Sequence, residues 1–278
     1  MKKTLIRTII CLFYGAIFLS AAEYTVPFMD RVPILDGRLG VAEWDDALAI
    51  SGAGSKLDPR LTSVFLGFDE QNLYLASRSE LPPRGNLYVS PNPTAHVVMD
   101  DSIELWFLPP AEQRVLEAGK FGYFQLIVNS VGRVYARHHE PGYGLPAKEW
   151  QSGVQQQHRC EDGFWTAELA FPAQAFGLEN FSQDGDWRLL LVRNFRSEPA
   201  YQAPISDANG FMNTSSYSLF KFRRQAPAVR AEYGPTIRPS RRKREKTASM
   251  IAPPTFSKLM STPSGHNWSS SAPTSWLR

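Results

Sequence analysis

The chain has 278 residues, of which 43% are hydrophobic and 21% are charged, a composition typical of a globular protein with its own core. The formal net charge of +3 is unevenly divided, because residues 23–222 hold 16 Lys and Arg against 25 Asp and Glu, whereas residues 223–278 hold 11 against 2. An acidic body does not favour binding to nucleic acid or to an anionic membrane, but its carboxylates suit calcium.

The first 22 residues are typical of a secretory signal peptide. Three basic residues precede an apolar stretch over residues 8–19, and Ser20, Ala21 and Ala22 provide the small residues of a cleavage site. The stretch is shorter than the roughly 20 residues of a membrane-spanning helix. We therefore expect a secreted, periplasmic or cell-surface protein that begins at Glu23 and has no membrane span after cleavage.

Cys160 is the only cysteine after the predicted cleavage, because Cys11 lies in the signal segment. An internal disulfide is then impossible, and stability must come from a hydrophobic core. We interpret Cys160 as a small packing residue without a reactive role.

The body of the chain alternates short β-rich runs with turn residues. Residues 62–69 and 72–79 are separated by Glu70 and Gln71, which predicts a hairpin. Several runs alternate apolar and polar residues, as strands with one buried face do. The further predicted strands cover residues 102–108, 123–129, 133–137, 154–158, 164–171, 187–194 and 217–222.

Helical pieces are expected only at residues 41–49, 111–118 and 172–176. Many short strands without alternating helices predict an all-β fold, an antiparallel two-sheet sandwich of jelly-roll or immunoglobulin-like type. We expect this domain to cover residues 23–225. Residues 226–278 are rich in Pro, Ser and Arg without periodicity, which predicts a disordered basic tail.

Catalytic motifs are missing from the sequence. It has no GxSxG, HExxH, Walker or GxGxxG motif and no Cys/His cluster with zinc spacing. His138 and His139 are adjacent, so on a strand they point to opposite faces and do not chelate one metal together. Acidic residues cluster at turns, where Asp69, Asp100 and Asp101 are candidate ligands for a structural calcium ion.

An ordered series of motifs resembles the family 9 carbohydrate-binding modules, which belong to the DOMON-like group of β-sandwiches. The opening "IDG…W…A" and the hairpin "D…LYL" are followed by strands that read "DSVELF", "QF.VN..G" and "GY.VEA.IP" in the family. The matching segments here are Ile34–Gly37 with Trp44 and Ala47, Phe68–Asp69 with Leu73–Leu75, Asp100–Leu108, Tyr123–Asn129 with Gly132, and Gly163–Pro172.

The resemblance implies a non-catalytic domain that binds the end of a mono-, oligo- or polysaccharide and accompanies separate glycoside hydrolases in carbohydrate breakdown. It also implies polar sugar contacts from Glu104, Gln125, Asn194 and Arg196. The two Trp residues between which members of the family hold a sugar ring have no counterparts here. We therefore expect a loop aromatic residue, Trp150 or Tyr201, to supply the stacking surface.

Two other functions remain open from the sequence. Related DOMON sandwiches hold a heme between Met and His, for which Met99 with His138 or His139 is the available pair. A stand-alone glycoside hydrolase needs two carboxylates facing each other across the sugar, and the sequence does not single out such a pair.

Overall fold

The computed structural model describes residues 22–40, 42–55, 58–92, 96–114, 122–140, 145–181, 185–197, 201–204, 211, 213–227 and 230–232. The predicted signal peptide, apart from Ala22, and the tail beyond Glu232 lie outside these residues. Among the described residues, no helix has the length and hydrophobicity needed to cross a membrane.

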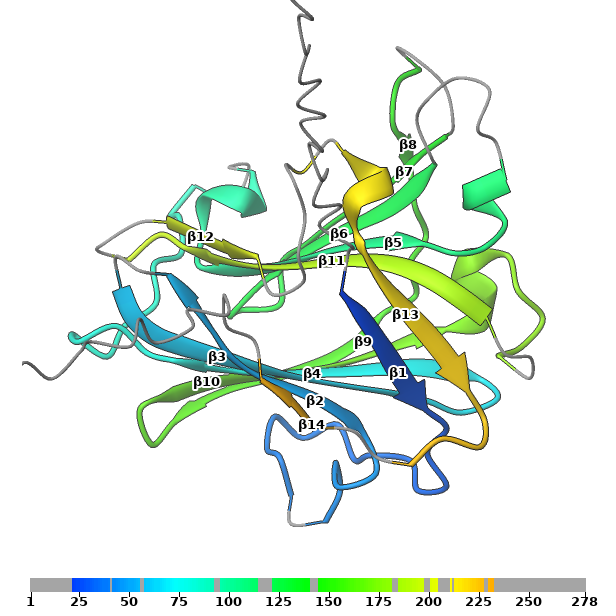
Figure 1. The fold of residues 1–278 in the computed structure, drawn as a ribbon. Helices are drawn as coiled ribbons and strands as arrows, with labels where there is room; N and C mark the ends of the chain where they lie inside the picture. The colour runs from blue at the N-terminus through cyan, green and yellow to red at the C-terminus, as the bar shows by residue number, and fades with distance from the viewer. Residues whose placement is uncertain are drawn as a thin grey trace, which may run out of the picture. The chain divides into compact units, whose positions relative to one another are not determined.

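The described residues form two stacked β-sheets, which confirms the predicted all-β sandwich (Figure 1). The larger sheet has the order β1 (Glu23–Pro27), β13 (Ser218–Arg223), β11 (Gly185–Phe195), β5 (Ser102–Leu108), β6 (Tyr123–Asn129), β7 (Val134–His139) and β8 (Lys148–Glu149), and β12 (Tyr201–Pro204) also pairs with β11. The smaller sheet has the order β14 (Arg230–Glu232), β2 (Leu48–Ser55), β3 (Asp58–Phe68), β4 (Asn72–Glu80), β10 (Phe164–Pro172) and β9 (Gln155–Glu161).

Strand pairing is antiparallel except where β1 joins β13 and β14 joins β2. The hairpin predicted around Glu70 and Gln71 is confirmed as the pair β3 and β4. Its turn is held by Asp69, whose Oδ1 accepts hydrogen bonds from the backbone N–H groups of Gln71 and Asn72, both at 2.7 Å.

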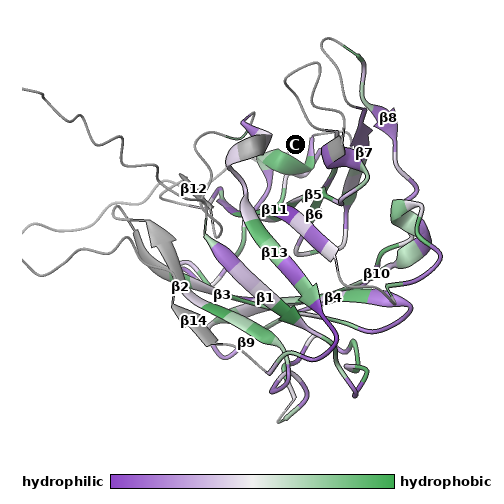
Figure 2. Ribbon diagram, turned by 45° about the vertical axis from the view of Figure 1, so that its right-hand side comes forward, coloured by the Kyte–Doolittle hydropathy of each residue, from purple (hydrophilic) through white to green (hydrophobic). Residues whose placement is uncertain are grey.

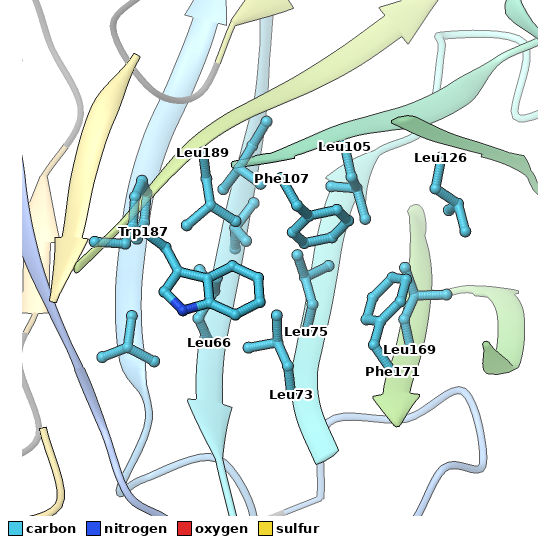
Figure 3. Packing of buried hydrophobic residues seen from close by; sticks show 14 of the residues in the cluster. Leu66, Leu73, Leu75, Leu105, Phe107, Leu126, Leu169, Phe171, Trp187 and Leu189 are labelled. Atoms are coloured by element: carbon cyan, nitrogen blue, oxygen red, sulfur yellow. The ribbon is translucent and has the colours of Figure 1, made fainter. Parts of the chain in front are cut away.

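Alternation of side chains places the core between the two sheets. Along β13, buried and half-buried side chains alternate, and Phe220 and Phe222 are buried. From Phe220 to Arg223 the hydropathy alternates as well (Figure 2). Figure 3 shows the inward-facing side chains of the two sheets meeting in one layer, with Leu105, Phe107, Leu126, Trp187 and Leu189 from the larger sheet and Leu66, Leu73, Leu75, Leu169 and Phe171 from the smaller. Burial of each such side chain contributes about 1.5–3 kcal/mol.

A second apolar layer covers the outer face of the larger sheet. Trp106, Tyr123, Leu190, Val192 and Tyr217 are buried there together with Leu108. A sheet with a hydrophobic cluster on both faces has strands that read as nearly continuous apolar runs, as β5 and β11 do.

The helical predictions are only partly confirmed. Short 3₁₀ turns occupy Glu112–Arg114 and Ala173–Phe176, in two of the expected places, and two more lie at Val97–Met99 and Thr214–Ser216. The prediction for residues 41–49 is wrong for the residues described, because they form turns and the start of β2. Residues 115–118 of the second prediction lie outside the described residues.

The fold extends into the segment predicted to be disordered. Strand β14 pairs with β2 from Arg230 to Glu232, beyond the expected boundary at residue 225. Parallel pairing needs only the backbone groups of an edge strand, so the polar sequence of this segment gives no hydrophobic signal of it.

Candidate functional site

Three of the predicted sugar-contacting residues meet in one hydrogen-bonded network on the outer face of the larger sheet. Glu104 on β5 accepts a bond from Gln125 Nε2 on β6 at 2.7 Å through Oε1, and from Asn194 Nδ2 on β11 at 3.2 Å through Oε2. The two partners lie 21 and 90 residues away in sequence. Strand order brings them together, because β5 is the common neighbour of β6 and β11.

An aromatic group lies beside this network. The indole Nε1 of Trp106 donates to Glu104 Oε1 at 2.7 Å. Its ring stacks on Tyr123 with a centroid separation of 4.6 Å, and Tyr123 in turn stacks on His139 at 4.2 Å. The three rings thus extend the network across β5, β6 and β7.

His139 connects the aromatic group to the polar network. Its Nε2 lies 3.1 Å from Gln125 Oε1. Because Gln125 donates its amide to Glu104, its oxygen is an acceptor, so His139 carries a proton on Nε2. Burial, followed by the neighbouring charges of His138 and Arg137, lowers the pKa of His139, which favours its neutral form. Burial also raises the pKa of Tyr123 to about 12.

The side chains of the network differ in solvent exposure, from buried at Glu104 and Asn194 to half-buried at Gln125 and His139. Glu104 is only 3% exposed and Asn194 is fully buried, whereas Gln125 and His139 are half-buried. The three donors to Glu104 among the described residues are neutral groups. A nearly buried carboxylate held by neutral donors can accept further hydrogen bonds from a ligand.

Polar and aromatic side chains of β7 lie next to the half-buried part of the network. Arg137 is paired with Gln125 across the strands, and its guanidinium lies 4.8 Å from the ring centre of Tyr135. Both residues also line a cavity of about 390 Å³ at the edge of the sheet, together with Glu149, Trp150, Gln151 and Gln156. Such a volume lies within the range of small-molecule sites.

Trp150 does not offer an open stacking face. It is 6% exposed, its Nε1 donates to the backbone oxygen of Ala175 at 2.7 Å, and its ring contacts Phe124 and Phe171 in the core. The segment that we expected to be a loop platform instead covers the end of the core, so the structure gives Trp150 a packing role.

The two remaining residues predicted to contact the sugar, Arg196 and Tyr201, form no hydrogen bond to the network among the described side chains. Arg196 donates from Nε to the backbone oxygen of Val98 at 2.9 Å and lines a different cavity. Tyr201 pairs through its backbone with Phe195 at the start of β12. Its side chain lies outside the part of the chain that can be described.

The three carboxylates predicted to bind calcium have other hydrogen-bond partners in the structure. Asp69 holds the β3–β4 turn and accepts from the hydroxyl of Tyr74 at 2.7 Å. Asp100 accepts from Ser90 N and Asn129 Nδ2, and Asp101 accepts from four N–H groups, so both are engaged by donors that a cation would have to displace. Within the described ranges, no group of three His, Cys, Asp or Glu side chains gathers as a metal site.

The pair proposed for a heme has other contacts. His138 Nε2 lies 3.0 Å from Glu112 Oε1, and its ring stacks on Phe124, whereas His139 stacks on Tyr123. The two histidines therefore point to opposite faces, as their adjacency predicts. Met99 is 55% exposed at the end of a 3₁₀ turn.

The opening motif of the resemblance has a structural explanation. Glu168 on β10 is fully buried and accepts hydrogen bonds from the backbone of Asp36 and Gly37 and from Trp44 Nε1. Gly37 has a φ of +82°, and a Cβ there would lie 2.9 Å from that of Arg159. This motif therefore anchors the N-terminal loop to the smaller sheet.

Sequence reasoning did not assign three residues, Trp106, Tyr123 and His139, to the sugar site. The alternation of side chains along a strand could have placed two of these residues at the site. Trp106 is two residues from Glu104 and Tyr123 is two residues from Gln125, so each pair lies on the same face of the sheet.

Comparison with known proteins supports the fold. No family model and no curated protein matches the sequence. Among solved structures, a family 9 carbohydrate-binding module from Caldicellulosiruptor kristjanssonii in complex with cellotriose is 14% identical, with a TM-score of 0.51 over 73% of this chain and 95% of that one. A family 9 module from the same organism in complex with glucose is 13% identical, with a TM-score of 0.52 over 74% and 98%.

A proposed carbohydrate-binding protein from Bacteroides uniformis is similar to the same extent, with 12% identity and a TM-score of 0.52 over 73% of this chain and 99% of that one. At these identities the likeness establishes the fold. The chain therefore has the fold of the family 9 carbohydrate-binding modules, as its motifs predicted.

Proposed function

We propose that this domain binds a carbohydrate on the outer face of its larger sheet and does not cleave it. The observation that carries the proposal is the convergence of Glu104, Gln125 and Asn194 on one network in a fold whose structural neighbours were solved with cellotriose and glucose. Among the described residues, the side chains that donate to Glu104 are those of Trp106, Gln125 and Asn194, none of which is the second carboxylate that a glycosidase needs.

The ligand approaches the half-buried end of the network. Gln125 and His139 present amide and imidazole groups to sugar hydroxyls, and Arg137 adds a fork of donors beside Tyr135. Glu104 and Trp106 lie beneath them and fix the orientation of Gln125. Because Trp106 and Tyr123 are nearly buried, stacking is limited, and we expect weak binding with a Kd between about 0.1 and 10 mM, equivalent to roughly 3–5.5 kcal/mol.

Titration of the purified chain with glucose and cellotriose, followed by NMR or calorimetry, tests this proposal. Gln125→Leu removes a half-buried polar contact, and Glu104→Gln replaces the carboxylate at nearly constant volume. Each is expected to weaken binding about tenfold, the effect of losing one or two hydrogen bonds to a ligand. The matched control is Gln157→Leu, an exposed glutamine on β9 of the other sheet, which leaves affinity unchanged.

Either of two experimental results would contradict the proposal. One is the absence of any response to either sugar well above the millimolar range. The other is a response that survives both Gln125→Leu and Glu104→Gln in variants whose melting temperature shows that they are folded.

We further propose that the protein is exported and acts on carbohydrate outside the cytoplasm, beside separate glycoside hydrolases. The basic start, the apolar stretch over residues 8–19 and the small residues 20–22 support export. N-terminal sequencing of secreted material is expected to give Glu23 as the first residue. Recovery of the chain with Met1 intact contradicts export by cleavage.

A further inference from the structure

A second cavity lies between the loop that follows β4 and the residues that follow β11. It has a volume of about 690 Å³ and is lined by Pro82, Pro83, Arg84, Asn86, Leu87, Tyr88, Arg196 and Ser197. Its described lining contains two arginines and no carboxylate, although the body of the chain is acidic. Neither Glu104, Gln125 nor Asn194 lines it.

Both walls of this cavity are fixed by one buried carboxylate. Asp101 Oδ2 accepts from Tyr88 N on one wall at 2.7 Å and from Ser197 N on the other at 3.0 Å. Its Oδ1 accepts from Arg196 N at 3.1 Å and from the buried guanidinium of Arg193 at 3.2 Å. Charge-assisted bonds of this kind hold the two walls at a set separation before any ligand arrives.

Three side chains of the cavity are suited to different parts of a ligand. Tyr88 is 47% exposed and offers an aromatic face, whereas Asn86 is an exposed amide. Arg196 is half-buried, and its Nε is bonded to Val98 O, which leaves its two Nη groups without another partner among the described residues. A guanidinium anchored through Nε presents its remaining N–H groups as a planar fork, the geometry that pairs with a carboxylate.

We propose that this cavity binds a sugar residue that carries a carboxylate, that is, a uronic acid. The carboxylate pairs with Arg196, assisted by Arg84, and the apolar face of the ring lies on Tyr88. Asn86 bonds to a ring hydroxyl. That the ligand is a sugar rests on the proposed function, whereas its negative charge follows from the two arginines alone.

The test uses the full chain titrated with trigalacturonate and with the same trisaccharide after reduction of its carboxyl groups to alcohols. We expect trigalacturonate to bind at least tenfold more tightly than the reduced form, and its affinity to fall as salt is added. Arg196→Gln, which keeps a side chain able to bond to Val98 O, is expected to weaken binding of trigalacturonate about tenfold or more. Tyr88→Leu, which keeps apolar volume, is expected to weaken it several-fold.

Arg38→Gln is the matched control, because Arg38 is an exposed arginine paired with Glu161 outside this cavity, and its loss leaves the affinity unchanged. Equal binding of the two trisaccharides, no binding of trigalacturonate at millimolar concentration, or equal effects of Arg38→Gln and Arg196→Gln overturn the proposal.

The outcomes also separate this cavity from the outer-face site. Glu104→Gln is expected to weaken binding of cellotriose and leave that of trigalacturonate unchanged, and Arg196→Gln is expected to do the reverse. Cellotriose binding without trigalacturonate binding overturns only the second site. If trigalacturonate binding is lost in Glu104→Gln and kept in Arg196→Gln, the anionic ligand binds at the outer face. This result also overturns the proposed uronic acid site beside Arg196.

Discussion

Removal of the Asp101 carboxylate is expected to be the most damaging single change at the start of β5. Asp101 is fully buried and pairs with Arg193, which is also fully buried, at 3.2 Å. Its oxygens also accept the backbone N–H groups of Tyr88, Arg196 and Ser197. In Asp101→Ala, the guanidinium of Arg193 stays between the two sheets without its counter-charge, and three N–H groups lose their acceptor.

The size of the effect follows from the ion pair. Removing one partner of a buried pair costs about 3–5 kcal/mol, because the other charge is left in a medium of low polarity. For a domain of about 200 residues, each kcal/mol lowers Tm by roughly 2–4 °C, so we expect a fall of about 6–20 °C. Arg193 also lies over the rings of Trp165 and Phe195, at 4.8 and 4.3 Å, which offsets part of the loss.

Thermal and urea denaturation followed by circular dichroism measure this loss. The matched control is Asp186→Ala, because Asp186 pairs with Arg223 at 2.6 Å with its side chain 52% exposed, and such a surface pair contributes less than about 1 kcal/mol. If Asp101→Ala does not accumulate as folded protein, Asp101→Asn gives a milder form of the same test, because it removes the charge and keeps one acceptor oxygen.

A double variant separates the ion pair from general disruption. Arg193→Met removes the cation, and the combined variant is expected to be less destabilised than the sum of the two single variants by more than about 1 kcal/mol. A loss in Asp101→Ala no larger than that in Asp186→Ala, or simple additivity with Arg193→Met, would refute the view that this pair holds the end of the sandwich together.

Three further predictions concern pH, calcium and the tail. Burial lowers the pKa of His158 to about 4 from an unfolded value near 6.5, so the unfolded state binds more protons between these values. The free energy of unfolding is therefore expected to fall as the pH drops from 6.5 towards 4, and in His158→Gln this part of the fall disappears; an unchanged pH profile contradicts the assignment. Because Asp100 and Asp101 are engaged by N–H donors, neither calcium nor EDTA is expected to shift Tm, and a calcium-dependent rise of several degrees would reveal a site elsewhere. Truncation after Glu232 is expected to leave Tm unchanged, whereas truncation after residue 225 removes β14 and lowers it; equal Tm values contradict a stabilising role for β14.

Local patterns predicted most of the strands because their side chains alternate or are continuously apolar. The bounds predicted for β5 and β6 agree with the structure, and the predicted β3–β4 hairpin was confirmed. Strands β1, β2, β8, β12 and β14 were missed, since β2 contains Gly52 and Gly54 and the other four have only two to five residues. Such strands depend on a neighbour for their hydrogen bonds, so tertiary pairing determines them more than local preference does.

The candidate site was only partly predictable for a related reason. Motif order grouped Glu104, Gln125 and Asn194, and the structure joins them in one hydrogen-bonded network, while their contact with a sugar stays a prediction. The role of Trp150 could not be read from the sequence, because a tryptophan between strands either stacks on a ligand or closes the core. Its position over Phe124 and Phe171 depends on the arrangement of segments that lie far apart in sequence.

Two of the buried carboxylates near the start of β5, Asp101 and Glu104, illustrate how packing and binding are separated in this sandwich. Asp101 is neutralised by Arg193 between the sheets, so its removal leaves an opposite charge buried and is expected to be costly to the fold. Among the described residues, the donors to Glu104 are neutral groups on the outer face, so we expect Glu104→Gln to cost no more than the reorientation of a few hydrogen bonds. For this reason we expect the binding of sugar to be sensitive to Glu104 at unchanged stability, and stability to be sensitive to Asp101.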